Sequence, residues 1–249
     1  MKSHSPVWFL LIILILVLVA AQAFSDDGDA VVIGHFSAAE PGDGTPEGWE
    51  PLTFDAIDRH TEYRLVDFDG TTVMEARSEA SASGLIFKKR IDPQQYPVIR
   101  WRWRATNTYE KGDVTQKSGD DYPARLYIAF EYDPGKVGLL ERAQFRAIRA
   151  IRGEYPPMRA INYIWASHAP VGTMVENAYT DRAMMFVVES GKDNLNAWVS
   201  HSRNILADYR AAFGKDPPMI QGIAIMTDAD DTGESATTYY GDIVLEPPE

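Results

Sequence analysis

The sequence predicts an all-β protein, an antiparallel β-sandwich interrupted by one helical insertion. Three observations lead to this prediction. Apolar and polar side chains alternate at period two in several segments, which places them on opposite faces of a sheet. Turn residues separate most of these segments. Helical patterns are too few to follow every strand, as a parallel sheet of βαβ units would require.

The first 23 residues are predicted to be a cleavable signal peptide. Lys2 precedes an apolar run from Val7 to Ala21, and the small residues Ala21 and Ala23 form a cleavage signal before an acidic stretch. A run of about 15 apolar residues is shorter than the ~20 needed to span a bilayer, although a retained anchor is the alternative. We therefore expect an exported protein, periplasmic or extracellular, with residues 24–249 as a single domain.

Composition excludes several classes of protein. The chain has no cysteine, which excludes a disulfide scaffold, a zinc ribbon and thiol catalysis. The formal net charge is −12, and losing Lys2 makes it −13. Such a surface repels phosphate backbones, so a nucleic-acid partner is not expected. A polysaccharide, a peptide or a basic protein fits this charge.

The period-two pattern defines the strands and their faces. Predicted strands cover residues 30–36, 85–90, 99–105, 125–132, 161–166, 183–189, 197–200, 220–226 and 239–245. In 99–105, Trp101 and Trp103 face one way, and the intervening arginines, including Arg102 and Arg104, face the other. We interpret the tryptophan face as core and the arginine face as a ligand-binding surface.

Two helices are predicted between these strands. The first, residues 137–152, belongs to an insertion of about 134–158 and ends at Gly153. Its basic side carries Arg142, Arg146 and Arg149, opposite Leu140, Ala147 and Ile151. This side is either a solvated helix face or a docking surface for anionic lipid or an acidic protein. The second helix, residues 202–213, is predicted to pack on the core through Ile205, Tyr209 and Phe213.

The segment 119–125 brings two carboxylates and a guanidinium together before a strand. Asp121 and Arg125 can orient a polar ligand, or Asp120 or Asp121 can act as a base, while a structural ion pair is the alternative. Trp49 and Trp198 are further stacking candidates. The candidate ligand-binding residues are Arg102, Arg104, Asp121, Arg125, Tyr127, Trp165 and His168.

The acidic segment 228–234 is interpreted either as a solvated surface turn or as a calcium site. Asp228, Asp230 and Gly233 match places one, three and six of a calcium-binding loop, but place twelve is Tyr239 rather than glutamate, which excludes an EF-hand. Asp242 is a candidate to complete such a site.

Catalytic motifs are missing from the sequence. It contains no H-x-x-x-H, no G-x-S-x-G, no P-loop and no G-x-G-x-x-G. The pattern therefore identifies no catalytic residues, and whether the protein is an enzyme stays open.

Several blocks together resemble a bacterial exported family catalogued as domain of unknown function 3047. The blocks are Trp-Arg-Trp-Arg at 101–104, Gly-Asp-Asp-Tyr-Pro-Ala-Arg-Leu-Tyr at 119–127, Ile-Asn-Tyr-Ile-Trp-Ala at 161–166, Gly-Ile-Ala-Ile-Met-Thr-Asp at 222–228 and Tyr-Gly-Asp-Ile at 240–243. The resemblance implies a bacterial envelope or secreted location. It implies no activity and no catalytic residues.

The chain is also similar, more weakly, to jelly-roll carbohydrate-binding modules of the galactose-binding-like type. The similarity lies in the acidic, glycine-rich opening loop that leads to Gly48 and Trp49 and in the closing strand from Tyr240 to Leu245. It implies a jelly-roll sandwich with a structural calcium ion, for which the candidate ligands are Glu40, Asp43 and Asp242.

These observations lead to an expected function with two alternatives. We expect an exported, non-catalytic binding module for a glycan or another polar envelope ligand. One alternative is a glycan hydrolase or lyase that uses Asp120 or Asp121 with Arg125. The other is an envelope protein that docks through the basic helix.

Overall fold

The computed structural model describes residues 30–42, 44–153 and 155–248. Two β-sheets pack against each other around a shared hydrophobic core, so the predicted β-sandwich with a helical insertion is confirmed. The predicted signal peptide, residues 1–23, lies outside the described residues. No helix in the described part of the chain is long and apolar enough to cross a membrane.

The six-stranded sheet has the order β11-β6-β13-β4-β3, and β1 pairs with the C-terminal half of β13. All of its strand pairs are antiparallel, as predicted. Its strands are β1 (Val31–Gly34), β3 (Glu62–Phe68), β4 (Thr71–Glu79), β6 (Val98–Ala105), β11 (Val199–Asn204) and β13 (Ser235–Glu246). Strands β3 and β4 are absent from the predicted set. They form a hairpin whose turn residues, Asp69 and Gly70, both have positive φ, as a primed turn requires.

The seven-stranded sheet has the order β2-β5-β12-β7-β8-β10-β9. Its strands are β2 (Trp49–Leu52), β5 (Gly84–Ile91), β7 (Arg125–Phe130), β8 (Arg159–Ala166), β9 (Met174–Asn177), β10 (Thr180–Ser190) and β12 (Ile220–Met226). Strands β8 and β10 pair in parallel, so the prediction of antiparallel pairing is wrong for this pair. The chain passes from β8 to the sheet edge as β9 and turns back, which places β10 between β8 and β9.

Aromatic side chains from both sheets meet in the core. The Trp101 ring on β6 stacks on the Tyr163 ring on β8, with centroids 5.2 Å apart. Trp103 and Trp165 are fully buried and lie 6.5 Å apart. The prediction that the two tryptophans of β6 face the core is therefore confirmed.

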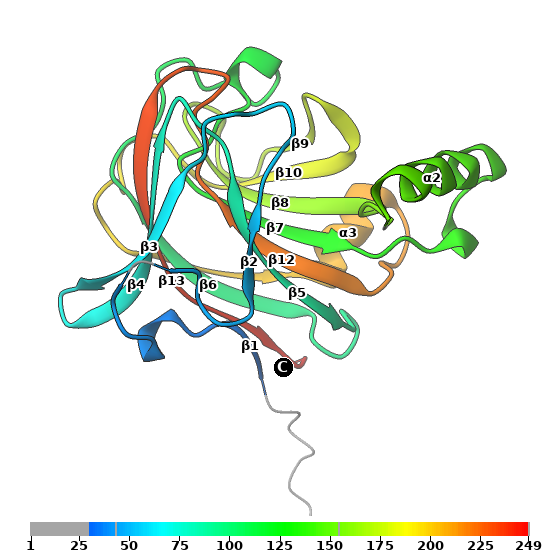
Figure 1. Ribbon diagram of the computed structural model, residues 1–249, viewed down its shortest axis with the longest axis horizontal. Coiled ribbons are helices and arrows are strands. Elements are labelled where there is room, and N and C mark those ends of the chain that lie inside the picture. Colours follow the sequence, from blue (N-terminus) through cyan, green and yellow to red (C-terminus); the bar gives the residue numbers. More distant parts are fainter. Residues whose placement is uncertain (1–29, 43, 154, 249) are drawn as a thin grey trace, which may run out of the picture.

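The two α-helices among the described residues differ in how they pack. Helix α2 (Leu139–Arg152) projects beyond the strand ends in Figure 1 and ends at Gly153, which is left-handed as predicted. Its buried contact is Phe145, stacked 4.3 Å from Tyr132. Leu140 is 77% exposed, so the predicted apolar side is wrong for that residue.

Helix α3 (Ile205–Phe213) packs on the core through Ile205 and Tyr209, as predicted. It begins three residues later than predicted, because the preceding residues belong to β11. Asn204 caps it by accepting a hydrogen bond from the Ala207 amide. The part of the chain that the structure describes also contains three short 3₁₀ helices: η1 (Phe36–Ala38), η2 (Lys117–Gly119) and η3 (Pro134–Lys136).

Candidate functional site

Strand β6 places three arginines on the outer face of the six-stranded sheet. Arg100, Arg102 and Arg104 alternate with side chains that enter the core. Arg100 forms an ion pair with Glu246. Arg102 and Arg104 instead lie against aromatic rings, so β6 presents two guanidinium groups beside aromatic surface.

Three aromatic rings surround these two guanidinium groups. Arg102 Cζ lies 4.7 Å from the centroid of the Trp198 ring. Arg104 Cζ lies 4.9 Å from that of Phe68 and 5.7 Å from that of Tyr239. The Phe68 centroid is 5.7 Å from that of Trp198 and 4.9 Å from that of Tyr239. All five side chains are half-buried. We call the surface formed by Phe68, Arg102, Arg104, Trp198 and Tyr239 the arginine–aromatic face.

Backbone turns hold two of these rings in place. Phe68 is the last residue of β3 and directly precedes the hairpin turn. Before Trp198, Asn196 adopts a left-handed conformation with φ of 62°. Its carbonyl accepts a hydrogen bond from Arg104 Nε at 2.9 Å, and its amide donates to the Ala105 carbonyl at 2.9 Å. These two bonds fix the loop that carries Trp198 against β6.

A depression of about 410 Å³ lies beside the arginine–aromatic face. This volume is within the range of small-ligand sites. The depression is lined, on the outer face of the sheet, by five side chains that can form hydrogen bonds: Arg100, Arg102, Ser200, Ser202 and Asp242. A Cβ atom at Gly241 would lie 2.5 Å from Arg102 Nε, so the glycine leaves the space that this arginine occupies.

Asp242, a predicted calcium ligand, is engaged by a serine. Its carboxylate accepts hydrogen bonds from the Ser37 amide at 2.9 Å and from Ser37 Oγ at 2.5 Å. Glu40 is exposed, and Asp43 lies outside the described residues. Calcium binding by this set stays a prediction.

A second charged cluster joins two loops at one end of the sandwich. Arg125, the first residue of β7, donates two hydrogen bonds to the carboxylate of Asp228, with Nε at 2.8 Å from Oδ1. It also donates to the Asp120 carbonyl and to Tyr127 Oη. The guanidinium lies 4.3 Å from the centroid of the Tyr122 ring. Every nitrogen of this guanidinium therefore has a partner.

This geometry corrects the interpretation of both loops. The structural ion pair at the entry of β7 is present, since Arg125 Nη1 lies 3.9 Å from Asp120 Oδ2, but the acid to which Arg125 is hydrogen-bonded is Asp228, 103 residues along the chain, rather than Asp121. Asp228 is 2% exposed, so a solvated turn is the wrong description of this residue. Arg125 is 3% exposed and paired with Asp228, so the structure gives it a role inside the protein, and its contact with a ligand stays a prediction.

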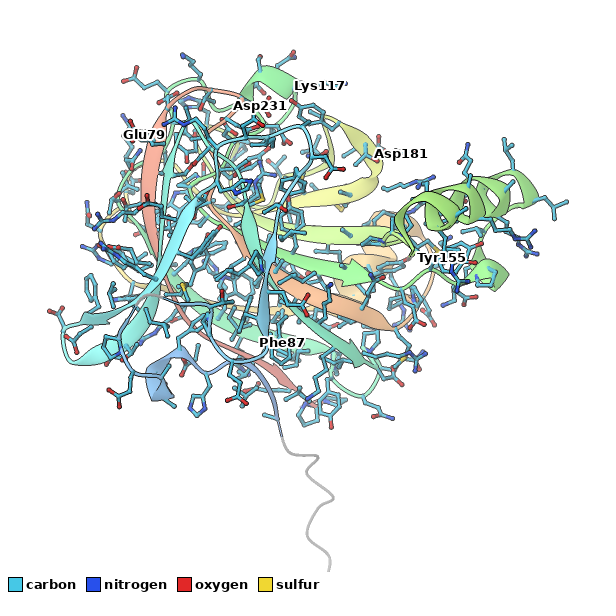
Figure 2. The ribbon with its side chains drawn as sticks, in the orientation of Figure 1. Glu79, Phe87, Lys117, Tyr155, Asp181 and Asp231 are labelled. Carbon is cyan, nitrogen blue, oxygen red and sulfur yellow. The ribbon has the colours of Figure 1, made fainter. Side chains whose placement is uncertain are left out.

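Asp121 forms a carboxylate cluster with Asp230 and Asp231. One oxygen of each lies within 4.8 Å of the others. Asp121 is fully buried, and its Oδ2 accepts a hydrogen bond from the Thr232 amide. Tyr179 Oη donates to Asp231 Oδ1 at 2.5 Å. Figure 2 shows Asp231 and Lys117 at the end of the sandwich opposite the C-terminus, which Figure 1 marks in the same orientation.

Crowding of like charges changes the acidity of this cluster. Burial, together with the negative charges of Asp121 and Asp231, raises the pKa of Asp230 to about 6. Burial also raises the pKa of Asp231, and Asp121 adds to the effect. Ionisation of all the carboxylates in this cluster therefore costs free energy.

The residues proposed for a hydrolase or lyase are held by other groups. Asp120 Oδ1 accepts a hydrogen bond from Tyr122 Oη at 3.1 Å, and Oδ2 accepts one from Asn177 Nδ2 at 2.8 Å. Asp121 is fully buried. With Arg125 also engaged, these residues do not form an open pair of carboxylates for glycosidic bond cleavage.

The remaining predicted ligand residues, Tyr127, Trp165 and His168, each contact a different group of the protein. Tyr127 holds Arg125 through its hydroxyl. Trp165 is fully buried and its Nε1 donates a hydrogen bond to the Gly191 carbonyl, so the structure places it in the core, and its contact with a ligand stays a prediction. His168 is exposed, and its Nε2 lies 3.1 Å from the Glu110 carbonyl oxygen.

The arginines of α2 are partly occupied by neighbouring groups. Arg142 donates to the Val137 carbonyl, and Arg149 lies over the Tyr155 ring at 4.7 Å. Arg146 is exposed. Docking to an acidic partner or lipid through this helix stays a prediction.

Two members of the arginine–aromatic face, Phe68 and Tyr239, were not among the predicted site residues. The Asp-Gly dipeptide at 69–70 is a hairpin signal that locates Phe68 at a strand end. The alternation of β13 places Tyr239 opposite Arg104. Asp228 has no local signal that identifies Arg125 as its partner.

Comparison with known proteins identifies the family. The family model described as "Protein of unknown function (DUF3047)" matches residues 47–244, so the chain belongs to this family, as its sequence blocks predict. No curated protein matches the chain.

Solved structures to which the chain is similar include a family 29 carbohydrate-binding module, which is 10% identical with a TM-score of 0.34 over 88% of this chain and 92% of that chain. A family 28 module specific for non-crystalline cellulose is 13% identical with a TM-score of 0.36 over 89% and 93%. Endoglucanase 3 of Trichoderma harzianum is 9% identical with a TM-score of 0.41 over 90% and 100%. At these values the function of the chain has to be inferred from its own residues.

Proposed function

We propose that this member of the family is an exported binding protein for an acidic glycan and that the arginine–aromatic face is its binding surface. The observation that carries the proposal is the pairing of two guanidinium groups with three half-buried rings. An aromatic ring presents a flat apolar surface to the C–H face of a sugar. A guanidinium donates paired hydrogen bonds to a carboxylate. A saccharide that carries carboxylates can stack its C–H face on the aromatic rings and accept hydrogen bonds from the guanidinium groups.

Arg102 is the residue best placed to bind an anionic group. Its guanidinium has no hydrogen-bond partner among the residues described, and it lies between the Trp198 ring and Gly241. These contacts order the side chain before a ligand arrives, which lowers the entropy cost of binding. Arg104 is ordered in the same way by its bond to Asn196.

The charge of the protein supports an acidic ligand at this face in particular. The formal net charge of −12 makes most of the surface repel anions. Two arginines on one strand create a local positive area, which the depression lined by Ser200 and Ser202 extends with hydroxyl groups. An acidic glycan is therefore directed to this face.

Calorimetric titration of the purified protein tests the proposal. The ligands are a polyuronate, and as a neutral comparison a β-glucan of similar length. A hydrogen bond to a charged group contributes about 1.5–3 kcal/mol, so Arg102→Ala is expected to weaken polyuronate binding roughly 10- to 150-fold. Trp198→Ala is expected to weaken it roughly 2- to 10-fold through the lost ring contact.

Arg90→Ala is the matched control. Arg90 is an exposed arginine on β5 of the other sheet, paired with Glu131, and its replacement is expected to leave binding unchanged. Equal affinity of all three variants and the wild type for the polyuronate contradicts the proposal. Equal affinity for the neutral glucan contradicts the assignment of an acidic ligand.

Export is proposed on the signal peptide of residues 1–23. Expression of the full chain in a bacterial host, followed by N-terminal sequencing of the periplasmic or secreted form, is expected to give Phe24 as the first residue. Recovery of the uncleaved chain with the membranes contradicts this proposal and supports the retained anchor.

A further inference from the structure

We propose that Asp121, Asp230 and Asp231 bind a calcium ion that joins the loop before β7 to the loop between β12 and β13. Each residue contributes a carboxylate oxygen, and these oxygens lie within 4.8 Å of one another. Calcium–oxygen distances of about 2.3–2.6 Å allow two ligands of one ion to be up to about 5 Å apart. The three oxygens are therefore close enough to share one ion.

A buried oxygen of Asp121 gives an independent reason for a ligand here. Asp121 is fully buried, and its Oδ2 is satisfied by the Thr232 amide. Its Oδ1 is also buried and has no hydrogen-bond partner among the described residues. An unsatisfied buried carboxylate oxygen is costly. A cation among the three carboxylates supplies the missing partner.

The positive side chains around the cluster are directed to other groups. Arg125 is fully engaged by Asp228 and its neighbours. Lys111 Nζ donates to a backbone carbonyl at 2.7 Å, and Lys117 Nζ lies over the Tyr179 ring at 5.1 Å. Three carboxylates in a partly buried site consequently repel one another, and a divalent cation relieves that repulsion.

The chemistry of the ligands favours calcium over other metals. The cluster consists of carboxylates, with neither histidine nor cysteine among its members, and such oxygen sites prefer hard cations. Magnesium requires nearly ideal octahedral geometry, whereas calcium accepts irregular sets of ligands. Ligands from two loops at the end of a sandwich suit the less demanding ion. This proposal does not depend on glycan binding.

Terbium luminescence and calcium calorimetry on the chelator-treated protein test the site. Terbium replaces calcium at oxygen sites and is excited by nearby tyrosines, which Tyr122 and Tyr179 provide. We expect sensitised terbium emission that calcium displaces, a calcium Kd of about 1 mM or below, and a higher thermal midpoint with calcium than with chelator.

Conservative variants locate the ion. Asp121→Asn and Asp230→Asn each remove one charge and are expected to weaken calcium binding at least tenfold and abolish the terbium signal. Asp230 is less buried than Asp121, so its variant is expected to fold even if Asp121→Asn does not. Asp216→Asn, an exposed aspartate paired with Arg210, is the control and is expected to bind calcium like the wild type.

Either of two results overturns the proposal: absence of calcium binding by the wild type, or wild-type calcium affinity in Asp230→Asn. If Asp242→Asn loses calcium binding while Asp230→Asn retains it, the ion belongs to the loop of Glu40. Equal affinity for magnesium overturns the assignment of calcium. Because every titration is done without glycan, its outcome is separate from that of the polyuronate experiment.

Discussion

Replacing Arg125 by methionine tests whether the Arg125–Asp228 pair holds the two loops together. Methionine keeps an apolar stem of similar length and removes the charge. The side chains of the pair are 3% and 4% exposed. The substitution removes two hydrogen bonds to Asp228, one to the Asp120 carbonyl and one to Tyr127. It leaves the Asp228 carboxylate buried beside the carboxylates of the neighbouring cluster.

The expected loss follows from this burial. Removing one partner of a buried pair costs about 3–5 kcal/mol, because the other charge stays buried without compensation. For a chain of this size the loss corresponds to a thermal midpoint roughly 6 to 20 °C lower. Arg210→Met is the control, since Arg210 and Asp216 are each 52% exposed and water replaces their contact.

Urea unfolding followed by tryptophan fluorescence at neutral pH measures the effect. The double variant Arg125→Met with Asp228→Leu removes both charges, and it is expected to recover much of the stability lost in the single variant. A midpoint for Arg125→Met equal to that of Arg210→Met would refute the reasoning. A double variant no more stable than Arg125→Met would show that the unpaired charge is not the cause.

Three further outcomes are expected. Gly241→Ala displaces Arg102 from the Trp198 ring without straining the backbone, so calorimetry should show weaker polyuronate binding with an unchanged thermal midpoint. Phe145→Ala removes the buried contact of α2 outside the main core, so limited proteolysis within residues 139–152 should become at least tenfold faster while the urea midpoint of the sheets stays nearly the same. Burial lowers the pKa of His201 to about 4, whereas the pKa of a histidine in the unfolded chain is about 6.5. Between these two pKa values only the unfolded chain binds the proton, so the free energy of unfolding falls as pH drops from 7 to 5.5. Urea titrations at the two pH values should show a smaller fall for His201→Phe.

Local periodicity predicts much of the fold. The alternation in β6 was enough to assign Trp101 and Trp103 to the core and Arg102 to the outer surface, because both faces of a strand are encoded in neighbouring residues. The end of α2 is also predictable from Gly153, which stops the helix in the left-handed conformation. Resemblance of several sequence blocks predicted the family correctly.

Pairing between distant segments was not predictable in the same way. Nothing near Arg125 indicates that its acid is 103 residues away, and nothing in the sequence of β10 indicates that it inserts beside β8 in parallel. The arginine–aromatic face was not predictable for the same reason. Its residues Phe68, Arg104 and Tyr239 come from three strands, and only the folded sheet fixes the order of those strands. Candidate residues for such a site can be recognised one at a time, but their grouping requires the tertiary structure.

The position of β13 has a consequence for when the protein can fold. This strand, residues 235–246, lies between β6 and β4 and also pairs with β1. Until it has been synthesised, β6 and β4 have no neighbour on those edges, and the six-stranded sheet cannot close over the core. The six-stranded sheet therefore forms only after residues 235–246 have left the ribosome. Under the export that we propose, this delay keeps the chain extended and competent for translocation until β13 arrives.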